Sequence, residues 1–313
     1  MEESSFQFPR EVMIREDGPR EGFQLLDRIV PIEEKIELIN RLSQTGVKSI
    51  ETTAFVRPDR VPQHADAEKL AEGLTAVKGV RYRALYLNEK GLLRALQFPQ
   101  LELEGYLMLA ASESFLKKNN NVTLDEAILG TRKWLTLFQE NKLSLERLML
   151  STAFGHQDEG LIPPEKVVAI LDRVVNEISS HGMTLPEVTL ADTTGWANPL
   201  SVQTLVKCIR SRWPEMEIGL HLHDTRGTGM ANVFAGLQVG VSRFDCSVGG
   251  MGGCPFAKGA AGNVPTEDVA FLCEQLGIKT GIDLDAYISC AKYAQKIAGK
   301  PLPGKLKDGG LPR

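Results

Sequence analysis

Residues 219–232 read Gly-Leu-His-Leu-His-Asp-Thr-Arg-Gly-Thr-Gly-Met-Ala-Asn. The run begins as an apolar strand. Because side chains alternate across a strand, His221 and His223 are expected on the same face. Two neutral imidazoles side by side can hold one metal ion. The same spacing also fits two histidines at a strand end that pair with neighbouring carboxylates, so both interpretations stay open on these residues alone.

Short strand-like runs alternate with longer amphipathic runs on both sides of this stretch. The predicted strands are 11–14, 49–53, 81–87, 103–110, 147–152, 187–191, 217–221 and 243–247. The predicted helices are 31–44, 65–77, 88–98, 123–141, 164–181, 199–212 and 228–239. Eight strands alternating with helices predict an α/β fold, a (β/α)8 TIM barrel. We expect a single domain over 1–313, in which 248–313 carries a Gly-rich loop with Cys254 and additional C-terminal helices.

The composition is that of an ordinary globular protein, with 42% hydrophobic and 6% aromatic residues. A net charge of -4 without a long basic run argues against a nucleic-acid partner. No apolar run approaches the length of a membrane span. The five cysteines are not spaced as a zinc set, and the acidic N-terminus has no signal core. These features predict a reducing, cytoplasmic location.

Polar residues gather directly after the predicted strands. They occur at 15–22, 51–53, 151–156, 192–195, 221–224 and 245–247. In such barrels the carboxyl ends of the strands meet on one face, and that face carries the chemistry. The sequence therefore predicts an active face built from these segments.

Four of these segments carry a resemblance to a known family. They are Asp-Gly-Pro-Arg-Glu-Gly-Phe-Gln at 17–24, Ile-Glu-Thr-Thr-Ala-Phe-Val at 50–56, His-Leu-His-Asp-Thr at 221–225, and Ser-Val-Gly-Gly-Met-Gly-Gly-Cys-Pro-Phe-Ala-Lys-Gly-Ala-Ala-Gly-Asn at 247–263. In order and spacing they resemble the 3-hydroxy-3-methylglutaryl-CoA lyases, of the DRE-TIM metallolyase group. A resemblance in four motifs implies the fold and the reaction class together.

The resemblance implies a divalent metal ion held by Glu21, His221, His223 and Asn263. Imidazoles combined with carboxylate, amide and water oxygens favour Mg²⁺ or Mn²⁺, with Zn²⁺ the less favoured ion. Asn263 also has a simpler interpretation, as a turn residue in a Gly-rich loop.

The resemblance also implies cleavage of a 3-hydroxyacyl-CoA to acetyl-CoA and a keto acid such as acetoacetate. In that reaction Arg20 would stabilise the thioester enolate, with Glu51 orienting it, and Cys254 would protonate the enolate. Asp192 is the expected base, although a helix cap fits it equally and His221 competes for the role. Residues behind the ligands are expected to be Gln24 and Glu267.

Three departures from the family pattern lie near the predicted site. Glu21 stands where an aspartate is usual, Asp17 replaces a small apolar residue, and Leu25-Leu26-Asp27 replaces a stretch that usually begins Asn-Glu. A citramalyl-CoA or longer 3-hydroxyacyl-CoA substrate therefore stays open. The sequence is also compatible with a condensing synthase of the same barrel group and with a non-catalytic metal-binding barrel. The expected partners are an acyl-CoA substrate and a second copy in a homodimer, without nucleic acid or membrane.

Overall fold

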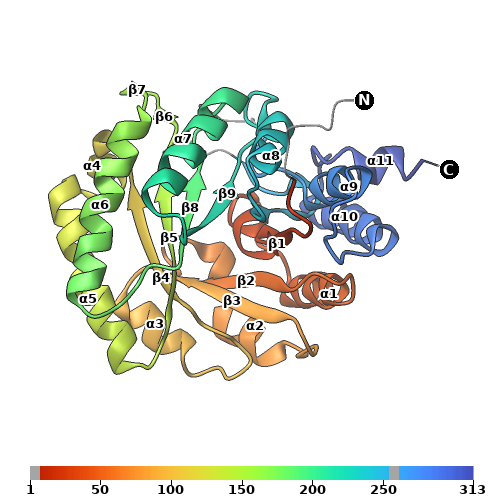
Figure 1. The fold of residues 1–313 in the computed structure, drawn as a ribbon. Coiled ribbons are helices and arrows are strands. Elements are labelled where there is room, and N and C mark those ends of the chain that lie inside the picture. Colours follow the sequence, from red (N-terminus) through yellow and green to blue (C-terminus); the bar gives the residue numbers. More distant parts are fainter. Residues whose placement is uncertain (1–7, 254–260, 313) are drawn as a thin grey trace, which may run out of the picture. The chain divides into compact units, whose positions relative to one another are not determined.

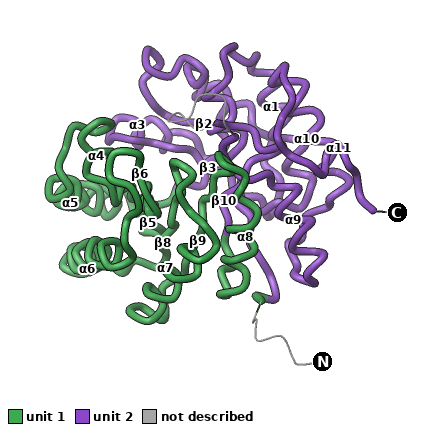
Figure 2. Tube along the Cα trace, turned by 90° about the horizontal axis from the view of Figure 1, so that it is seen from above, with its two compact units in different colours: residues 1–9, 104–243 green, residues 10–103, 244–313 purple. Residues whose placement is uncertain are grey.

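The computed structural model describes residues 8–253 and 261–312. Strands and helices alternate along the chain, as the sequence predicts (Figure 1). Its contacts form two compact units, which Figure 2 colours separately. Unit 1 contains residues 8–9 and Glu104–Arg243, and unit 2 contains Arg10–Leu103 and 244–312.

Unit 1 is built on four parallel strands in the sheet order β4-β5-β8-β9. The strands are β4 Gly105–Ala110, β5 Leu145–Ser151, β8 Glu187–Ala191 and β9 Glu217–His221. The helices are α4 Glu113–Asn120, α5 Leu124–Glu140, α6 Pro164–Ser180, α7 Pro199–Arg212 and α8 Gly229–Gln238. A short antiparallel hairpin, β6 Gly155–His156 with β7 Gly160–Leu161, follows β5.

The core of unit 1 lies between this sheet and its helices. α6 buries Val167, Ile170, Val174 and Ile178, which recur every three or four residues and therefore share one helix face. All of β8 is buried, as expected for a parallel strand covered on both faces. Consecutive helices from α5 to α8 pack against one another.

Unit 2 contains the other four strands, in the order β3-β2-β1-β10. These are β1 Met13–Glu16, β2 Ser49–Phe55, β3 Arg81–Tyr86 and β10 Arg243–Cys246, whose first residue belongs to unit 1. The longer helices are α1 Ile32–Ser43, α2 Ala67–Gly73, α3 Glu89–Ala95, α9 Thr266–Gln275 and α10 Leu284–Ala298. The short ones are η1 Gly18–Gly22, η2 Pro62–His64, η3 Val248–Gly250 and α11 Leu306–Gly309.

The eight predicted strands are all present, and a capping box formed by Thr123 and Glu126 starts α5. The first strand lies two residues later than predicted, because β1 includes Arg15 and Glu16. Both are buried beside partners far along the chain, such as Asp245 for Arg15 at 3.2 Å. The single-domain organisation over 1–313 stays a prediction. None of the described helices is long and apolar enough to cross a membrane.

Candidate active site

Arg20 and Glu21 lie in η1, a single turn of π-helix directly after β1. Such turns are rare and occur frequently at functional sites. The carbonyl oxygen of Asp17 accepts hydrogen bonds from the backbone N–H groups of Arg20 and Glu21, with N···O distances of 3.1 and 2.8 Å. Gly22 is needed because a Cβ there would lie 2.5 Å from the Met251 side chain. Local backbone contacts therefore fix where the two charged side chains begin.

A histidine from the next segment holds the same turn. His64 is buried, and burial lowers its pKa to about 4, so its ring is neutral at pH 7. Its Nε2 lies 2.9 Å from the carbonyl oxygen of Arg20, which only accepts hydrogen bonds. Nε2 therefore carries the proton and donates a hydrogen bond to the carbonyl oxygen of Arg20.

The guanidinium of Arg20 is placed between two carboxylates of unit 2. Its Nε donates to Glu51 Oε2, and its Nη2 lies 3.4 Å from Glu21 Oε2. Arg20 is 14% exposed and Glu51 only 4%. The coulombic attraction of Glu51, Glu21 and Asp17 outweighs the desolvation of the cation and raises the pKa of Arg20. The structure therefore confirms the predicted Arg20–Glu51 pair and holds Arg20 as a permanent cation.

Two residues of this network were not assigned a role from the sequence. Asp17 Oδ1 accepts from Arg83 Nη2 at 2.7 Å, and both side chains are buried. Burial raises the pKa of Asp17, and the Arg83 guanidinium opposes that rise. The available signal was Arg83 in the interior of β3, because a charged residue is unusual inside a buried parallel strand.

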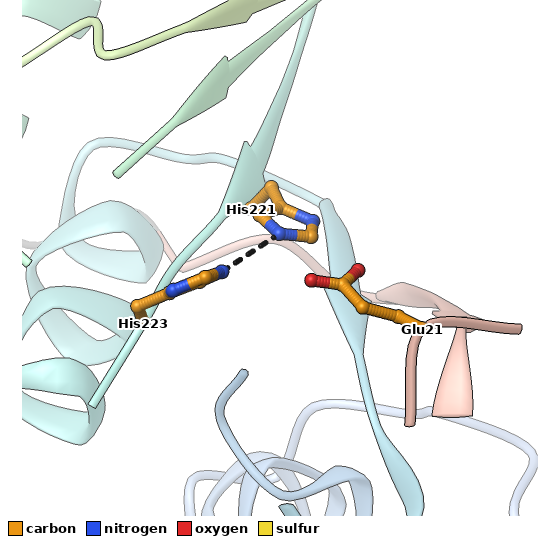
Figure 3. Close-up of side chains that lie close together, drawn as sticks. All are labelled: Glu21, His221 and His223. Atoms are coloured by element: carbon orange, nitrogen blue, oxygen red, sulfur yellow. Dashed lines mark hydrogen bonds between the residues drawn. The ribbon is translucent and has the colours of Figure 1, made fainter. Parts of the chain in front are cut away.

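His221 is the last residue of β9 in unit 1, His223 follows two residues later, and both are buried. Figure 3 shows their rings with one nitrogen of each facing the other. These two Nε2 atoms lie 3.2 Å apart. Two nitrogens bound to one ion at about 2.1 Å each lie roughly 3.0 Å apart when the bonds are perpendicular. The predicted projection from one face is therefore confirmed, and the spacing of the two nitrogens fits a shared ion.

Asp192 follows β8, the strand next to β9, and its backbone N–H donates to the carbonyl of His221 at 2.8 Å. Its Oδ1 accepts from Trp196 N at 2.7 Å. Its Oδ2 is buried and has no hydrogen-bond partner among the described residues. Burial raises the pKa of Asp192 to about 6. One oxygen therefore caps a turn, while the other has the environment of a proton acceptor.

We expect kcat/KM to decrease at acid pH if Asp192 acts as the base. The carboxylate must be deprotonated to accept a proton, and its pKa is about 6. A bound cation nearby lowers such a pKa, so the inflection should lie at or below that value. Below it kcat/KM should fall about tenfold per pH unit. A pH profile with saturating metal measures this, and an unchanged acid limb in Asp192→Asn would assign the limb to another group.

Asn263 and Glu267 belong to unit 2, at and just beyond the end of the Gly-rich segment. Asn263 is 1% exposed, and its Nδ2 and Oδ1 have no hydrogen-bond partner within 8–253 and 261–312. Buried amides are normally paired, so this one is consistent with a ligand role. Glu267 Oε2 accepts from Gly249 N at 2.9 Å, and burial raises the pKa of Glu267 to about 8.

Glu267 should make the stability of the metal-free protein depend on pH. Its folded-state pKa of about 8 exceeds its ordinary 4.5, so between these values the folded chain binds more protons than the unfolded chain. The free energy of unfolding therefore decreases as pH rises through this window. Denaturant midpoints at pH 5 and pH 8.5 should differ less in Glu267→Gln than in the wild type. An equal difference would show that Glu267 does not titrate in this way.

The remaining predicted site residues are Gln24 and Cys254. Gln24 follows η1 and is half-buried. Cys254 lies outside the described residues, so its catalytic role stays a prediction.

The HMGL-like family model matches residues 11–293. The hydroxymethylglutaryl-CoA lyase YngG of Bacillus subtilis is 40% identical over 298 residues, which cover 95% of this chain and 97% of that protein. An HMG-CoA lyase structure from Bacillus subtilis has a TM-score of 0.88 at 39% identity, covering 96% of this chain and 98% of the other.

A third relative was solved with bound molecules. The HMG-CoA lyase of Acinetobacter baumannii, in complex with coenzyme A and 3-methylmalate, has a TM-score of 0.85 at 38% identity. The match covers 97% of this chain and 96% of that one. Agreement with solved lyases over nearly the whole chain confirms the predicted α/β barrel and the enzyme class, a carbon–carbon lyase. The motifs around Arg20 and His221, the folding of both units and the extent of these matches lead to one assignment: the chain belongs to the HMGL-like family, that of the hydroxymethylglutaryl-CoA lyases.

Proposed function

We propose that this chain cleaves a 3-hydroxyacyl-CoA of the hydroxymethylglutaryl type to acetyl-CoA and a keto acid such as acetoacetate. The observation that carries the proposal is the buried Arg20–Glu51 pair in a chain that matches a hydroxymethylglutaryl-CoA lyase over 97% of that lyase. A retro-Claisen cleavage releases an enolate, and a fixed guanidinium is suited to stabilise it. Arg20 supplies that guanidinium.

The HMGL-like family depends on a divalent metal ion, and this chain carries residues able to hold one. The proposed ligands are Glu21, His221, His223 and Asn263. Their donor set fits a Mg²⁺ or Mn²⁺ site, since it combines two imidazoles with carboxylate and amide oxygens. The 3.2 Å spacing of the imidazole nitrogens supports this set, as does the buried amide of Asn263, which has no partner among the residues that the structure describes. When bound, the ion makes the substrate hydroxyl more acidic.

The side chains divide the proton transfers between them. Asp192 takes the proton of the 3-hydroxyl group, and the resulting alkoxide electron pair forms the ketone as the C–C bond breaks. The electron pair of that bond passes into the thioester, and Arg20 donates hydrogen bonds to the enolate oxygen. The Cys254 thiol then gives its proton to the enolate carbon, which completes acetyl-CoA. Proton loss at the hydroxyl and proton gain at carbon balance for the substrate, and proton exchange with water returns Asp192 to its carboxylate and Cys254 to its thiol.

The test is a panel of 3-hydroxyacyl-CoAs incubated with the full-length protein and Mg²⁺ or Mn²⁺, with acetyl-CoA read by mass. Cleavage of the hydroxymethylglutaryl thioester supports the proposal. Product formation only from acetyl-CoA and a 2-oxo acid would identify a condensing synthase, and no turnover with any substrate would identify a non-catalytic barrel. Cys254→Ser should lower kcat by about 100-fold and leave metal binding unchanged. Unchanged kcat would remove the cysteine from the mechanism.

A second substrate is favoured by one observation. The Acinetobacter baumannii relative was solved with coenzyme A and 3-methylmalate, a branched hydroxydiacid. In this chain Leu25 and Leu26 follow Gln24, and such apolar residues suit a branched or longer acyl group. Methyl-substituted malyl thioesters, including citramalyl-CoA, therefore belong in the same panel. The ratio of kcat/KM values between the two thioesters decides which substrate the chain prefers.

We also propose an oligomeric state and a cellular location for this chain. One is assembly as a homodimer, which the mass of the protein in solution tests. The other is a cytoplasmic location, which fractionation of the source cells tests.

A further inference from the structure

Arg83 is a buried cation that the proposed reaction does not yet use. It lies on β3 and its side chain is 3% exposed. Its Nε donates to Ser49 Oγ at 2.7 Å, and its Nη2 donates to Asp17 Oδ1 at 2.7 Å. Its Nη1 lies 3.8 Å from Glu51 Oε1. All three partners belong to unit 2, and two of them lie on β2.

The strand register explains why Arg83 reaches Glu51. In the parallel β2–β3 pair, Glu51 is aligned with Arg83, so their side chains project from the same face. The register shifts between Glu51 and Thr53, and Thr52 Oγ1 donates to the Arg83 carbonyl at 3.0 Å. Irregularities of this kind redirect side chains next to active sites. The two residues are therefore locked side by side by backbone pairing.

Glu51 consequently lies between two guanidinium groups. Its Oε2 accepts from Arg20 Nε, and its Oε1 faces Arg83 Nη1. A carboxylate with a hydrogen-bonded cation on one side and an ion pair at 3.8 Å on the other has less freedom to rotate than one with a single cation beside it. The direction in which Glu51 presents Oε2 to Arg20 therefore depends on Arg83.

The charges of Asp17, Arg83, Glu51 and Arg20 are matched, apart from Glu21, the second carboxylate beside Arg20. Arg83 and Asp17 form one buried pair, and Arg20 and Glu51 form the next. A lone Asp17 would add an uncompensated buried anion beside Glu51, which is costly. Arg83 removes that cost, so Asp17 and Arg83 are expected to act as one unit.

We propose that Arg83, with Asp17 as its counter-charge, is a positioning residue that holds Glu51 and through it aims the guanidinium of Arg20. The proposal rests on the proposed lyase function. Arg83 touches no reacting atom in it and acts only through Glu51. If the Asp17–Arg83 pair were only structural, its removal would change stability and leave the rate of turnover alone.

The kinetic test replaces the pair as a whole, because removing one member would leave a buried unpaired charge. In Asp17→Val/Arg83→Met, kcat should fall by about 100-fold, since small displacements of a catalytic group are costly. KM and the affinity for Mn²⁺ should change by less than about threefold. Arg83→Lys should lose less kcat than the double variant, because lysine keeps the positive charge although it lacks the planar guanidinium. A wild-type kcat in the double variant would overturn the proposal.

A matched control is available in unit 1. Arg147 is 2% exposed, and its Nε donates to Glu104 Oε1 at 2.8 Å, so it also belongs to a buried ion pair. Arg147→Lys should lower the unfolding temperature about as much as Arg83→Lys and leave kcat unchanged. Equal losses of kcat in both lysine variants would mean that general destabilisation explains the effect, and would overturn the positioning role.

A second measurement needs no enzymatic activity and so separates the two proposals. If Arg20 and Arg83 share Glu51, their replacements should not be additive. Arg20→Lys/Arg83→Lys should lower the denaturant midpoint by more than the sum of the single variants. Additive shifts would overturn the shared role of Glu51. The two proposals can fail separately. If the wild type cleaves no acyl-CoA, the lyase proposal is wrong. If the lysine variants are still non-additive in stability, the Arg20–Glu51–Arg83 linkage remains supported.

Discussion

Replacing Arg20 with glutamine lowers kcat/KM for a 3-hydroxyacyl-CoA by about 1000-fold, the expected loss for a group that stabilises charge in the transition state. Arg20 is 14% exposed and is held by Glu51, with Glu21 Oε2 3.4 Å away. Its position is therefore set before substrate binds, and the enolate meets a cation that needs no reorganisation. Glutamine retains part of the length and loses the charge.

The effect should appear mainly in kcat, because the enolate exists only after the C–C bond begins to break. Arg20→Lys should recover only part of the rate, since an ammonium group cannot donate along two directions of a planar fork. Arg132→Gln is a suitable control, because Arg132 is 57% exposed and pairs with Glu177 on the helices of unit 1. Steady-state kinetics beside thermal unfolding measure both. A change in KM alone would mean that Arg20 binds substrate without stabilising the enolate.

Removing both imidazoles should abolish metal binding and reduce turnover below detection. The Nε2 atoms of His221 and His223 lie 3.2 Å apart, so the double alanine variant deletes two adjacent donors at once. Each single alanine variant should weaken Mn²⁺ binding by at least about 100-fold, which exceeds the usual effect of changing a residue behind a ligand. Titration calorimetry with Mn²⁺ measures the affinity, and circular dichroism verifies the fold.

His181 provides the control for this experiment. It follows α6, and its Nδ1 lies 2.9 Å from the carbonyl oxygen of Glu177, away from the proposed ligands in the sequence. His181→Ala should bind Mn²⁺ and turn over as the wild type does. Full activity of the wild type after exhaustive chelation and dialysis would contradict the metal-dependent mechanism.

Local sequence patterns determined which elements form and in what order. Apolar periodicity is a property of neighbouring residues, so the eight strands and most of the helices between them could be predicted without tertiary information. The same holds for His221 and His223, because two residues separated by one position on a strand always share a face. The motif that contains Arg20 and the residue that pairs with it, Glu51, were also recognisable from the sequence.

Only the tertiary structure decided where charged residues are buried. Arg15 and Glu16 belong to β1, and Arg83 belongs to the interior of β3. Their hydrogen-bond partners lie between 2 and 271 positions away along the chain, and the distant partners cannot be predicted from a local sequence pattern. Helix α4 escaped prediction for a similar reason. It buries only Leu116 of its own residues, and its start is held by Glu159, which accepts from Ser114 N at 2.8 Å.

One physical cause explains why the elements could be predicted from the sequence and the buried charges could not. The strand or helix preference of a segment is set by its own backbone and by the spacing of its apolar side chains, and both can be read in order. The free energy of a buried charge is set by whichever group comes to lie beside it after folding. The sequence by itself therefore determined the alternating strands and helices and the residue types of the site, whereas the linkage of Asp17, Arg83, Glu51 and Arg20 was decided by folding.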